Sequence, residues 1–183
     1  MREKVRFGED VCAVMRDIHQ DGWNVVAVLK DLIGGVHWLY PGKNIVTNDG
    51  DTYYAQMAVG ETPTDDFAAA GAGLRLGTSN TAPAKTDTDV TTFGTDGDIV
   101  ATSAYPKTND GDADNTGAGV DIVTWKYEYG TGDANITGIQ EGAICDDRTT
   151  PTAALTHFLF AGSFNKTSSN TLKVFVNHTF TGV

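Results

Sequence analysis

The sequence predicts a mainly β protein: an antiparallel β-sandwich of the jelly-roll or immunoglobulin-like kind, with one short helix and long loops rich in Asp, Thr and Gly. Apolar and polar residues alternate with period two along the C-terminal third, as they do in half-buried strands. One face of these runs is apolar and the reverse is mostly polar, which is typical of an antiparallel sandwich. Charged residues make up only 20% of the chain and glycine is abundant, so an all-helical fold is not expected.

A chain of 183 residues commonly folds as one domain and buries enough surface for an ordinary hydrophobic core. We expect an N-terminal hairpin or arm over residues 1–43. A β-sandwich domain follows over residues 44–183, with an exposed acidic insertion at 78–121. The two cysteines, Cys12 and Cys145, lack the spacing of a metal or redox site, so buried thiols are expected. The sequence does not decide whether they pair.

The first elements expected are the strands of a hairpin. Residues 11–32 contain two apolar, β-branched runs around Asp21-Gly22, a pair that suits a type I′ turn. A helix over residues 10–20 is the alternative, because apolar residues there also recur at spacings of three and four. Pro41-Gly42 is then expected to start a turn, followed by a short strand at 44–47.

The clearest helix signal lies in residues 47–61. Thr47 is a good N-cap, acidic residues at 49 and 51 favour the first turn, and Gly60 is placed to end the helix. An apolar stripe that could lie on a sheet is formed by Tyr53, Met57 and either Tyr54 or Ala58.

The middle of the chain is expected to contain little regular structure. Residues 61–73 resemble a connection, and residues 74–76 alternate as a strand that enters a turn at Gly77. The segment 78–121 holds eight Asp and only two Lys, a composition that buries little apolar area. We therefore expect an exposed loop with a strand only at 98–105.

Four strands with short polar turns are expected to complete the chain, at residues 122–129, 136–145, 155–164 and 171–180. In the last of them, Leu172, Val174 and Val176 share one face with His178, because side chains alternate along a strand. Trp125, Tyr127 and Tyr129 likewise share one face of the first. That stripe is either a buried face or an exposed surface on which a sugar could stack.

The net charge of −11 argues against nucleic acid and membrane partners, since it repels phosphate groups and no cluster of Lys or Arg offsets it. No apolar run approaches the length of a membrane span. The first ten residues carry no secretion signal.

The sequence also predicts that the protein is not an enzyme. The four histidines, at 19, 37, 157 and 178, are not paired with a second ligand at a metal-binding spacing. Ser163 lacks the context of a nucleophile elbow. Glu128 and Glu141 are the only glutamates of the C-terminal strands, and a paired-carboxylate hydrolase would need them in a common cleft.

One segment matches a metal-binding pattern. Asp110, Asp112, Asp114 and Asp121 fall at the first, third, fifth and twelfth positions of a calcium loop of the EF-hand type. Asn115 stands where that loop has glycine, and no helix pair flanks it. A calcium site is therefore a candidate here, with a solvated acidic loop as the alternative, and no other cofactor is expected.

Several blocks of this chain resemble virion structural proteins of tailed viruses. They are NIVTNDGDTYYAQMAVGE, GLRLGTSNTAPAKTDTDV, ITGIQEGAI and LFAGSFNKTSSNTLKVFVNHTF, which together lie between residues 44 and 180. The chain has Gln140-Glu141-Gly142-Ala143-Ile144 where that group shows E-V-G-I/L-F, and its acidic insertion is longer.

The resemblance implies a non-catalytic role in the virion, either as a capsid decoration or cement protein or as a neck, tail or fibre-base component. We favour decoration, with attachment to the major capsid protein and a homo-oligomeric state. A glycan or receptor-binding module is the alternative of another class. Basic arms and aromatic anchors are common in interfaces, so the expected contact residues are Arg2, Lys4, Arg6, Trp23, Trp38 and Tyr40. The alternative is that these aromatic residues belong to the core.

Overall fold

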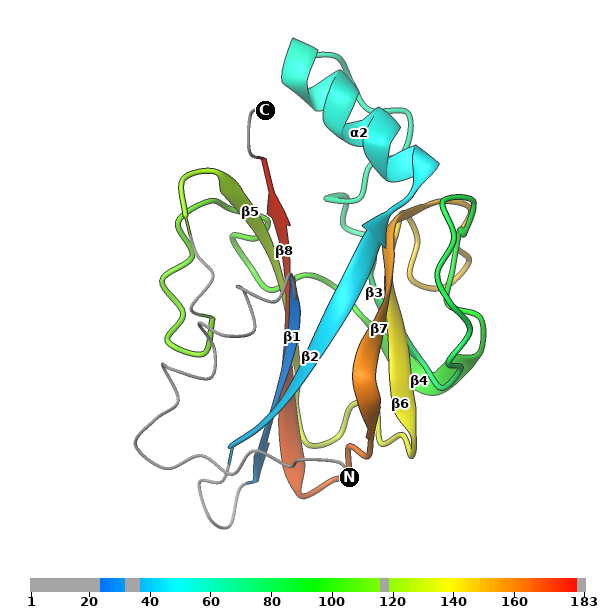
Figure 1. Ribbon diagram of the computed structural model, residues 1–183, viewed down its shortest axis with the longest axis vertical. Helices are drawn as coiled ribbons and strands as arrows, with labels where there is room; N and C mark the ends of the chain where they lie inside the picture. Colours follow the sequence, from blue (N-terminus) through cyan, green and yellow to red (C-terminus); the bar gives the residue numbers. More distant parts are fainter. Residues whose placement is uncertain (1–23, 32–36, 116–118, 181–183) are drawn as a thin grey trace.

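The computed structural model describes residues 24–31, 37–115 and 119–180 of the chain, and only the backbone of residues 37–41. These residues form eight strands and one helix (Figure 1). In chain order the elements are β1 (Val25–Asp31), β2 (His37–Val46), α2 (Asn48–Val59), β3 (Gly73–Gly77), β4 (Phe93–Ile99), β5 (Ile122–Tyr129), β6 (Ile139–Cys145), β7 (Ala154–Phe164) and β8 (Asn170–Thr179).

All eight described strands belong to one antiparallel sheet with the order β4-β3-β6-β7-β2-β1-β8-β5. The sheet curls into a half-barrel (Figure 1). As a result its two outermost strands approach each other, and the Tyr129 hydroxyl on β5 donates a 3.0 Å hydrogen bond to the Gly97 carbonyl on β4. The prediction of a mainly β, antiparallel fold is confirmed. Two separate sheets, as in a sandwich, are not confirmed.

The chain that follows β4 crosses to the other end of the sheet and runs along β5. Lys107 and Thr124 exchange backbone hydrogen bonds of 3.1 and 2.9 Å, and the Thr102 amide donates to the Lys126 carbonyl at 2.8 Å. Residues 102–107 therefore lie against the outer edge of β5.

The core fills the inside of the curl. On β5 and β8, three pairs of directly opposite residues contribute buried side chains to it: Trp125 with Val176, Tyr127 with Val174, and Tyr129 with Leu172. The apolar face predicted for the last strand is thus confirmed. The three aromatic residues of β5 are at most 1% exposed, which confirms their interpretation as a buried face.

The helix signal is confirmed at both ends. The Thr47 hydroxyl accepts a 3.1 Å hydrogen bond from the Gly50 amide, and Gly60 ends the helix in the left-handed conformation with φ of 76°. The expected apolar stripe extends along only part of α2, because Tyr53 is 5% exposed whereas Met57 is 51% exposed. Only the first half of α2 therefore packs on the end of the sheet.

The N-terminal part of the fold differs from the prediction at Pro41-Gly42. These residues start no turn, since β2 continues through them and pairs with β1 as far as Gly42. Proline has no amide hydrogen, so it is tolerated where a strand lacks a partner on one side. Pro41 meets this condition because the pairing of β2 with β7 begins only at Gly42. The hairpin that the structure describes joins β1 to β2. The predicted turn at Asp21-Gly22 and the run before it lie outside the described residues.

The acidic segment 78–121 also differs from the prediction. Its strand is β4, at Phe93–Ile99, and not at 98–105. The segment is not uniformly exposed, because Val90, Asp110 and Asn115 are buried. Composition predicted that this segment is exposed to solvent, because composition does not show which basic side chains its carboxylates contact.

Candidate functional site

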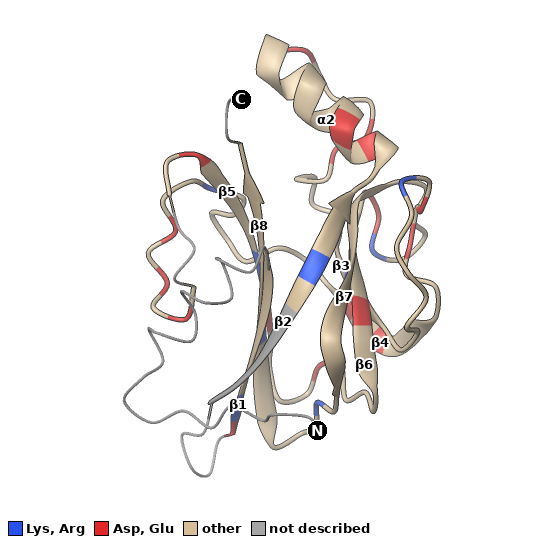
Figure 2. Cartoon of the chain, viewed as in Figure 1, with Lys and Arg blue, Asp and Glu red and all other residues tan. Residues whose placement is uncertain are grey.

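Two acidic segments pack on the outer face of the sheet. We call residues 78–92 the first strap and residues 102–115 the second strap. Figure 2 shows acidic residues along both loops, beside β6 and beside β5. Glu141, His157, Asp110 and Lys126 are buried ionisable groups that lie where these straps meet the strands.

Glu141 on β6 binds the first strap. Its Oε1 accepts hydrogen bonds from the amides of Ser79 (3.1 Å) and Thr92 (2.9 Å), and its Oε2 accepts one from the Thr91 amide (2.9 Å). The residue is 0% exposed. Burial alone would raise the pKa of Glu141, but hydrogen bonds from His157 and from these amides lower it below its usual value.

His157 on β7 lies between two carboxylates. Its Nε2 is 3.0 Å from Glu141 Oε2, and its Nδ1 is 2.7 Å from Asp87 Oδ2 of the first strap. Burial alone would lower the pKa of His157, but the hydrogen bonds and negative charges of Glu141 and Asp87 raise it above its usual value. The imidazole therefore favours its cationic form, in which both nitrogens donate.

This arrangement has the residue types of a proton relay but not the access that a relay needs. Glu141 and His157 are at most 1% exposed, and four hydrogen-bond contacts already engage the Glu141 carboxylate. The first strap is also held to the sheet by an ion pair of 2.7 Å between Arg75 Nε on β3 and Asp89 Oδ1 of the strap. The geometry fastens the first strap to the sheet.

The carboxylate partners of His157 come from other segments of the chain, so the absence of a ligand spacing along the sequence did not reveal them. Glu141 pairs with Leu159 and Ala143 pairs with His157, so Glu141 and His157 are diagonal neighbours across two strands. Spacing along one segment does not reveal such a pair. The available signal was a glutamate in a strand with no other charged residue.

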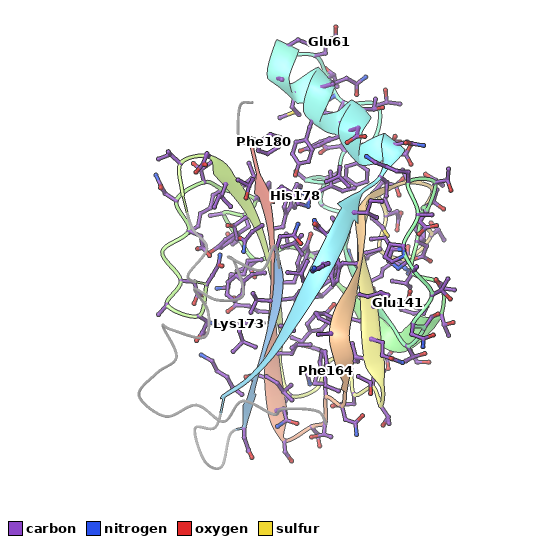
Figure 3. All side chains as sticks on the ribbon, viewed as in Figure 1. Glu61, Glu141, Phe164, Lys173, His178 and Phe180 are labelled. Atoms are coloured by element: carbon purple, nitrogen blue, oxygen red, sulfur yellow. The ribbon has the colours of Figure 1, made fainter. Side chains whose placement is uncertain are left out.

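The second strap is held by lysines from three strands. Lys126 on β5 lies 2.8 Å from Asp112, and Lys173 on β8 lies 3.0 Å from Asp112 and 2.8 Å from Asp114. Lys30 on β1 reaches Asp114 at 2.5 Å. Figure 3 shows Lys173 on the side of β8 that faces this loop.

Charge pairing dominates the titration of these groups. Burial alone would raise the pKa of Asp112, but hydrogen bonds from Lys126 and Lys173 lower it well below its usual value. Burial alone would lower the pKa of Lys126, whereas Asp112 and Glu128 raise it. The groups are therefore ionised around neutral pH.

A network of side-chain hydrogen bonds around Asp110 and Asn177 continues the attachment of the second strap. Asn115 donates to Asp110 at 2.8 Å and to Asn177 of β8 at 3.2 Å, and the Thr124 hydroxyl donates to Asn177 at 2.7 Å. The Tyr105 hydroxyl also donates to Asp110. The outer face of β5 and β8 is thus covered by the strap.

These contacts bear on the calcium candidate. Asp112 and Asp114 face lysine ammonium groups, and Asp110 is hydrogen-bonded to Asn115 and Tyr105. In the described part of the chain, no group of three or more His, Cys, Asp and Glu side chains, including Asp121, is arranged to hold a metal ion. In the structure Asp112 and Asp114 pair with lysines of the sheet, and calcium binding by this segment stays a prediction.

Most of the predicted partner contacts lie outside the described residues. Arg2, Lys4, Arg6 and Trp23 lie outside the described residues. Trp38 and Tyr40 are positions of β2, for which the backbone alone is described. Their role as contact residues stays a prediction. Cys12 also lies outside, and Cys145 is a buried free thiol.

A pocket of about 260 Å³ lies between α2 and the ends of β8, β1 and β2. We call it the α2 pocket. Figure 3 shows His178 and Phe180 at the end of β8, on the side toward α2. Its lining residues are Asn24, Val46, Asp51, Tyr54, His178, Thr179 and Phe180.

Three side chains form a polar chain at the floor of this pocket. The indole Nε1 of Trp125 donates to the Tyr54 hydroxyl oxygen at 3.1 Å, and this oxygen lies 2.5 Å from His178 Nδ1. Burial lowers the pKa of His178 to about 4, so its imidazole is neutral at pH 7. Its Nε2 is buried and has no hydrogen-bond partner.

The comparisons with protein families, with curated proteins and with solved structures find no match to this chain. In the residues that the structure describes, no helix has the length and apolar character needed to cross a bilayer.

Proposed function

We propose that this chain is an architectural protein: a structural component of a tailed-virus virion that decorates the capsid and attaches through many copies to the head lattice. The observation that carries the architectural part is the enclosure of Glu141 and His157. The constellation that most resembles catalytic machinery is at most 1% exposed and fastens a strap, so it supports a role in holding structure.

The virion part of the proposal rests on the sequence resemblance. Four blocks between residues 44 and 180 resemble tailed-virus structural proteins. They include residues of α2, of the first strap and of β8. We further propose that the two halves of the curled sheet face each other across the core as the layers of a sandwich do.

Attachment would use modest contacts that act together. A specific interface buries roughly 800 Å² on each partner, and linkage between copies raises the effective concentration of each next contact. We propose the major capsid protein as partner, a homo-oligomer as the attached unit, and residues 1–43 as the contacting segment.

The decisive experiment is to count copies of this chain in purified particles by quantitative mass spectrometry and to locate them by cryo-electron microscopy. Hundreds of copies spread over the head support decoration. A dozen or fewer at the neck or tail would replace decoration by the adaptor or fibre-base alternative. Absence of the chain from intact particles would overturn the virion proposal.

The aromatic residues first considered for the glycan-binding alternative are not accessible to a sugar. Trp125, Tyr127 and Tyr129 are at most 1% exposed, so they offer no face to a sugar. The two glutamates considered for an enzymatic alternative do not share an open cleft, because Glu141 is buried while Glu128 lies at the surface beside Lys126.

A further inference from the structure

The α2 pocket combines a buried unpaired nitrogen with an exposed aromatic ring. The two straps account for the ion pairs of the outer face, and the first strap meets the pocket at the ion pair between Lys85 and Asp51. The protonation of His178 decides what the pocket offers a ligand. An indole nitrogen can only donate, so the Tyr54 oxygen accepts the hydrogen bond from Trp125.

With that oxygen accepting from Trp125, the Tyr54 hydroxyl hydrogen is free to donate to His178 Nδ1, 2.5 Å away. A neutral imidazole carries one proton and accepts on its other nitrogen. The proton of His178 is then on Nε2. This N–H is buried and meets no acceptor in the protein, and a buried donor without an acceptor is unfavourable. A ligand that satisfies it must bring an acceptor.

A second unpaired donor belongs to the hydrogen-bond partner of a residue that lines the pocket. Asn24 lines the pocket. Its side-chain Nδ2 donates a hydrogen bond to Asn44 Oδ1, and the backbone N–H of Asn44 donates one to Asn24 Oδ1 at 3.0 Å. The Asn44 Nδ2 group is buried and has no partner. Of the three unpaired buried side-chain polar atoms in the described structure, one belongs to a residue that lines the pocket and one to the hydrogen-bond partner of such a residue.

The pocket also presents an acceptor. Asp51 of α2 lines it, and its Oδ2 is paired with Lys85 at 2.6 Å. A ligand that suits all these groups must both accept and donate. A pure cation has nothing to offer the unpaired N–H groups, and the net charge of −11 disfavours an anion. Hydroxyl groups do both without a charge.

The wall opposite these polar groups is aromatic. Phe180 is 49% exposed, and its ring lies edge-to-face with that of Tyr54 at a centroid distance of 4.9 Å. The negative face of an aromatic ring favours the positive edge of C–H groups. A volume of about 260 Å³ is below the roughly 300–1,000 Å³ of sites for drug-sized ligands, so the pocket suits a single ring.

From these contacts we propose that the α2 pocket binds a neutral pyranose sugar, with its C–H face on Phe180, one oxygen toward the Nε2 hydrogen of His178, and hydroxyl groups toward Asp51, Asn24 and Thr179. This inference does not rest on the virion proposal. On a particle with many copies, weak individual sites would add up on a polysaccharide that repeats the sugar.

The test is a titration of the full-length, isotope-labelled protein with methyl glucoside, methyl galactoside and N-acetylglucosamine, followed by amide NMR shifts. We expect saturable shifts at residues 178–180 and in α2, with a dissociation constant of ~1 mM or weaker for at least one sugar. Phe180→Ala should weaken binding about tenfold or more, and so should Thr179→Val to a smaller degree. Phe93→Ala, which removes a similarly exposed ring on β4, should leave binding unchanged.

Three results would overturn the proposal. The first is no saturable shift with any of the three sugars in a protein whose spectrum is folded. The second is equal loss of binding in Phe180→Ala and Phe93→Ala. The third is a stronger response to lysine amide or acetate than to the sugars. The imidazole ¹⁵N shifts provide a separate check, because a proton on Nδ1 of His178 would remove the unpaired donor on which the argument depends.

Discussion

The Nε2 atom of His157 lies 3.0 Å from the Oε2 atom of Glu141, and the two side chains, on adjacent strands, are 1% and 0% exposed. A pair of this kind requires its remaining polar atoms to be satisfied, since the cost of removing charges from water otherwise exceeds their attraction. Here Asp87 and three backbone amides of the first strap supply those partners. The pair is therefore stable only while the first strap is in place.

Glu141→Gln should destabilise the protein by about 3 kcal/mol, because the side-chain amide places N–H groups against backbone donors and leaves His157 with one carboxylate. Chemical denaturation at pH 7 measures the change. Glu128→Gln is the matched control: Glu128 is 41% exposed beside Lys126, and we expect a loss below about 1 kcal/mol. Equal losses in the two variants would contradict a special role for Glu141.

His178 should make stability depend on pH below neutrality. Its pKa is about 4 in the folded protein and about 6.5 in an unfolded chain. Between these values the unfolded chain binds a proton that the folded protein does not, so stability falls as the pH is lowered from 6.5 to 4, by about 3 kcal/mol from this group. His157, whose pKa is raised, contributes its change above pH 6.5 instead, where its stabilisation is lost as the pH rises.

The measurement is the free energy of unfolding of the wild type and of His178→Gln between pH 4 and pH 7. The variant should lose less stability than the wild type as the pH falls, because it lacks the group that the unfolded chain protonates. Parallel curves for the two proteins would show that His178 titrates normally.

Lys173→Met should loosen the second strap. The change removes the cation shared by Asp112 and Asp114, although Lys126 and Lys30 still pair with them. We expect a loss of about 1–2 kcal/mol and faster amide exchange in residues 107–115. Lys85→Met breaks a pair whose side chains are 47% and 59% exposed, and its loss should stay below about 1 kcal/mol. Unchanged exchange in 107–115 would mean that the strap is held by other contacts.

Gly50→Ala should destabilise the protein although alanine is the better helix former. A Cβ atom at position 50 would collide with the Leu155 carbonyl of β7, and the cost of such overpacking is about 1–3 kcal/mol. Gly71→Ala is the control, since nothing lies within 4 Å of a Cβ atom there. Thermal unfolding of both variants tests this, and a Tm for Gly50→Ala at or above the wild-type value would contradict the close approach of α2 to β7.

Much of the fold could be predicted from local patterns. The last four strands were found because alternation with period two marks a half-buried strand. The helix was found because Thr47 and Gly60 have the chemistry of its two ends. Alternation shows which side chains of a strand are buried but not which strands pair, so the joining of all eight into one curled sheet was not predictable in the same way.

The candidate sites depended on contacts between distant segments and were largely missed. Lys30, Lys126 and Lys173 come from three strands that are neighbours only through the sheet order. One signal was present: Phe175 stands on the otherwise polar face of β8 and is 0% exposed, which requires that face to be covered. The covering segment proved to be the Asp-rich loop that composition had assigned to solvent.

The path of residues 102–107 along β5 has a consequence for how copies of this protein can meet. A free strand edge is a template on which a neighbouring chain can continue the sheet, and this is a route to fibrous aggregates. At β5 that route is blocked by the protein's own backbone. At β4 the edge is irregular and charged, with Asp96 in the left-handed conformation at φ of 59° and Asp98 two residues on. Crowded copies must therefore recognise one another by side chains, which lets them pack densely without merging their sheets.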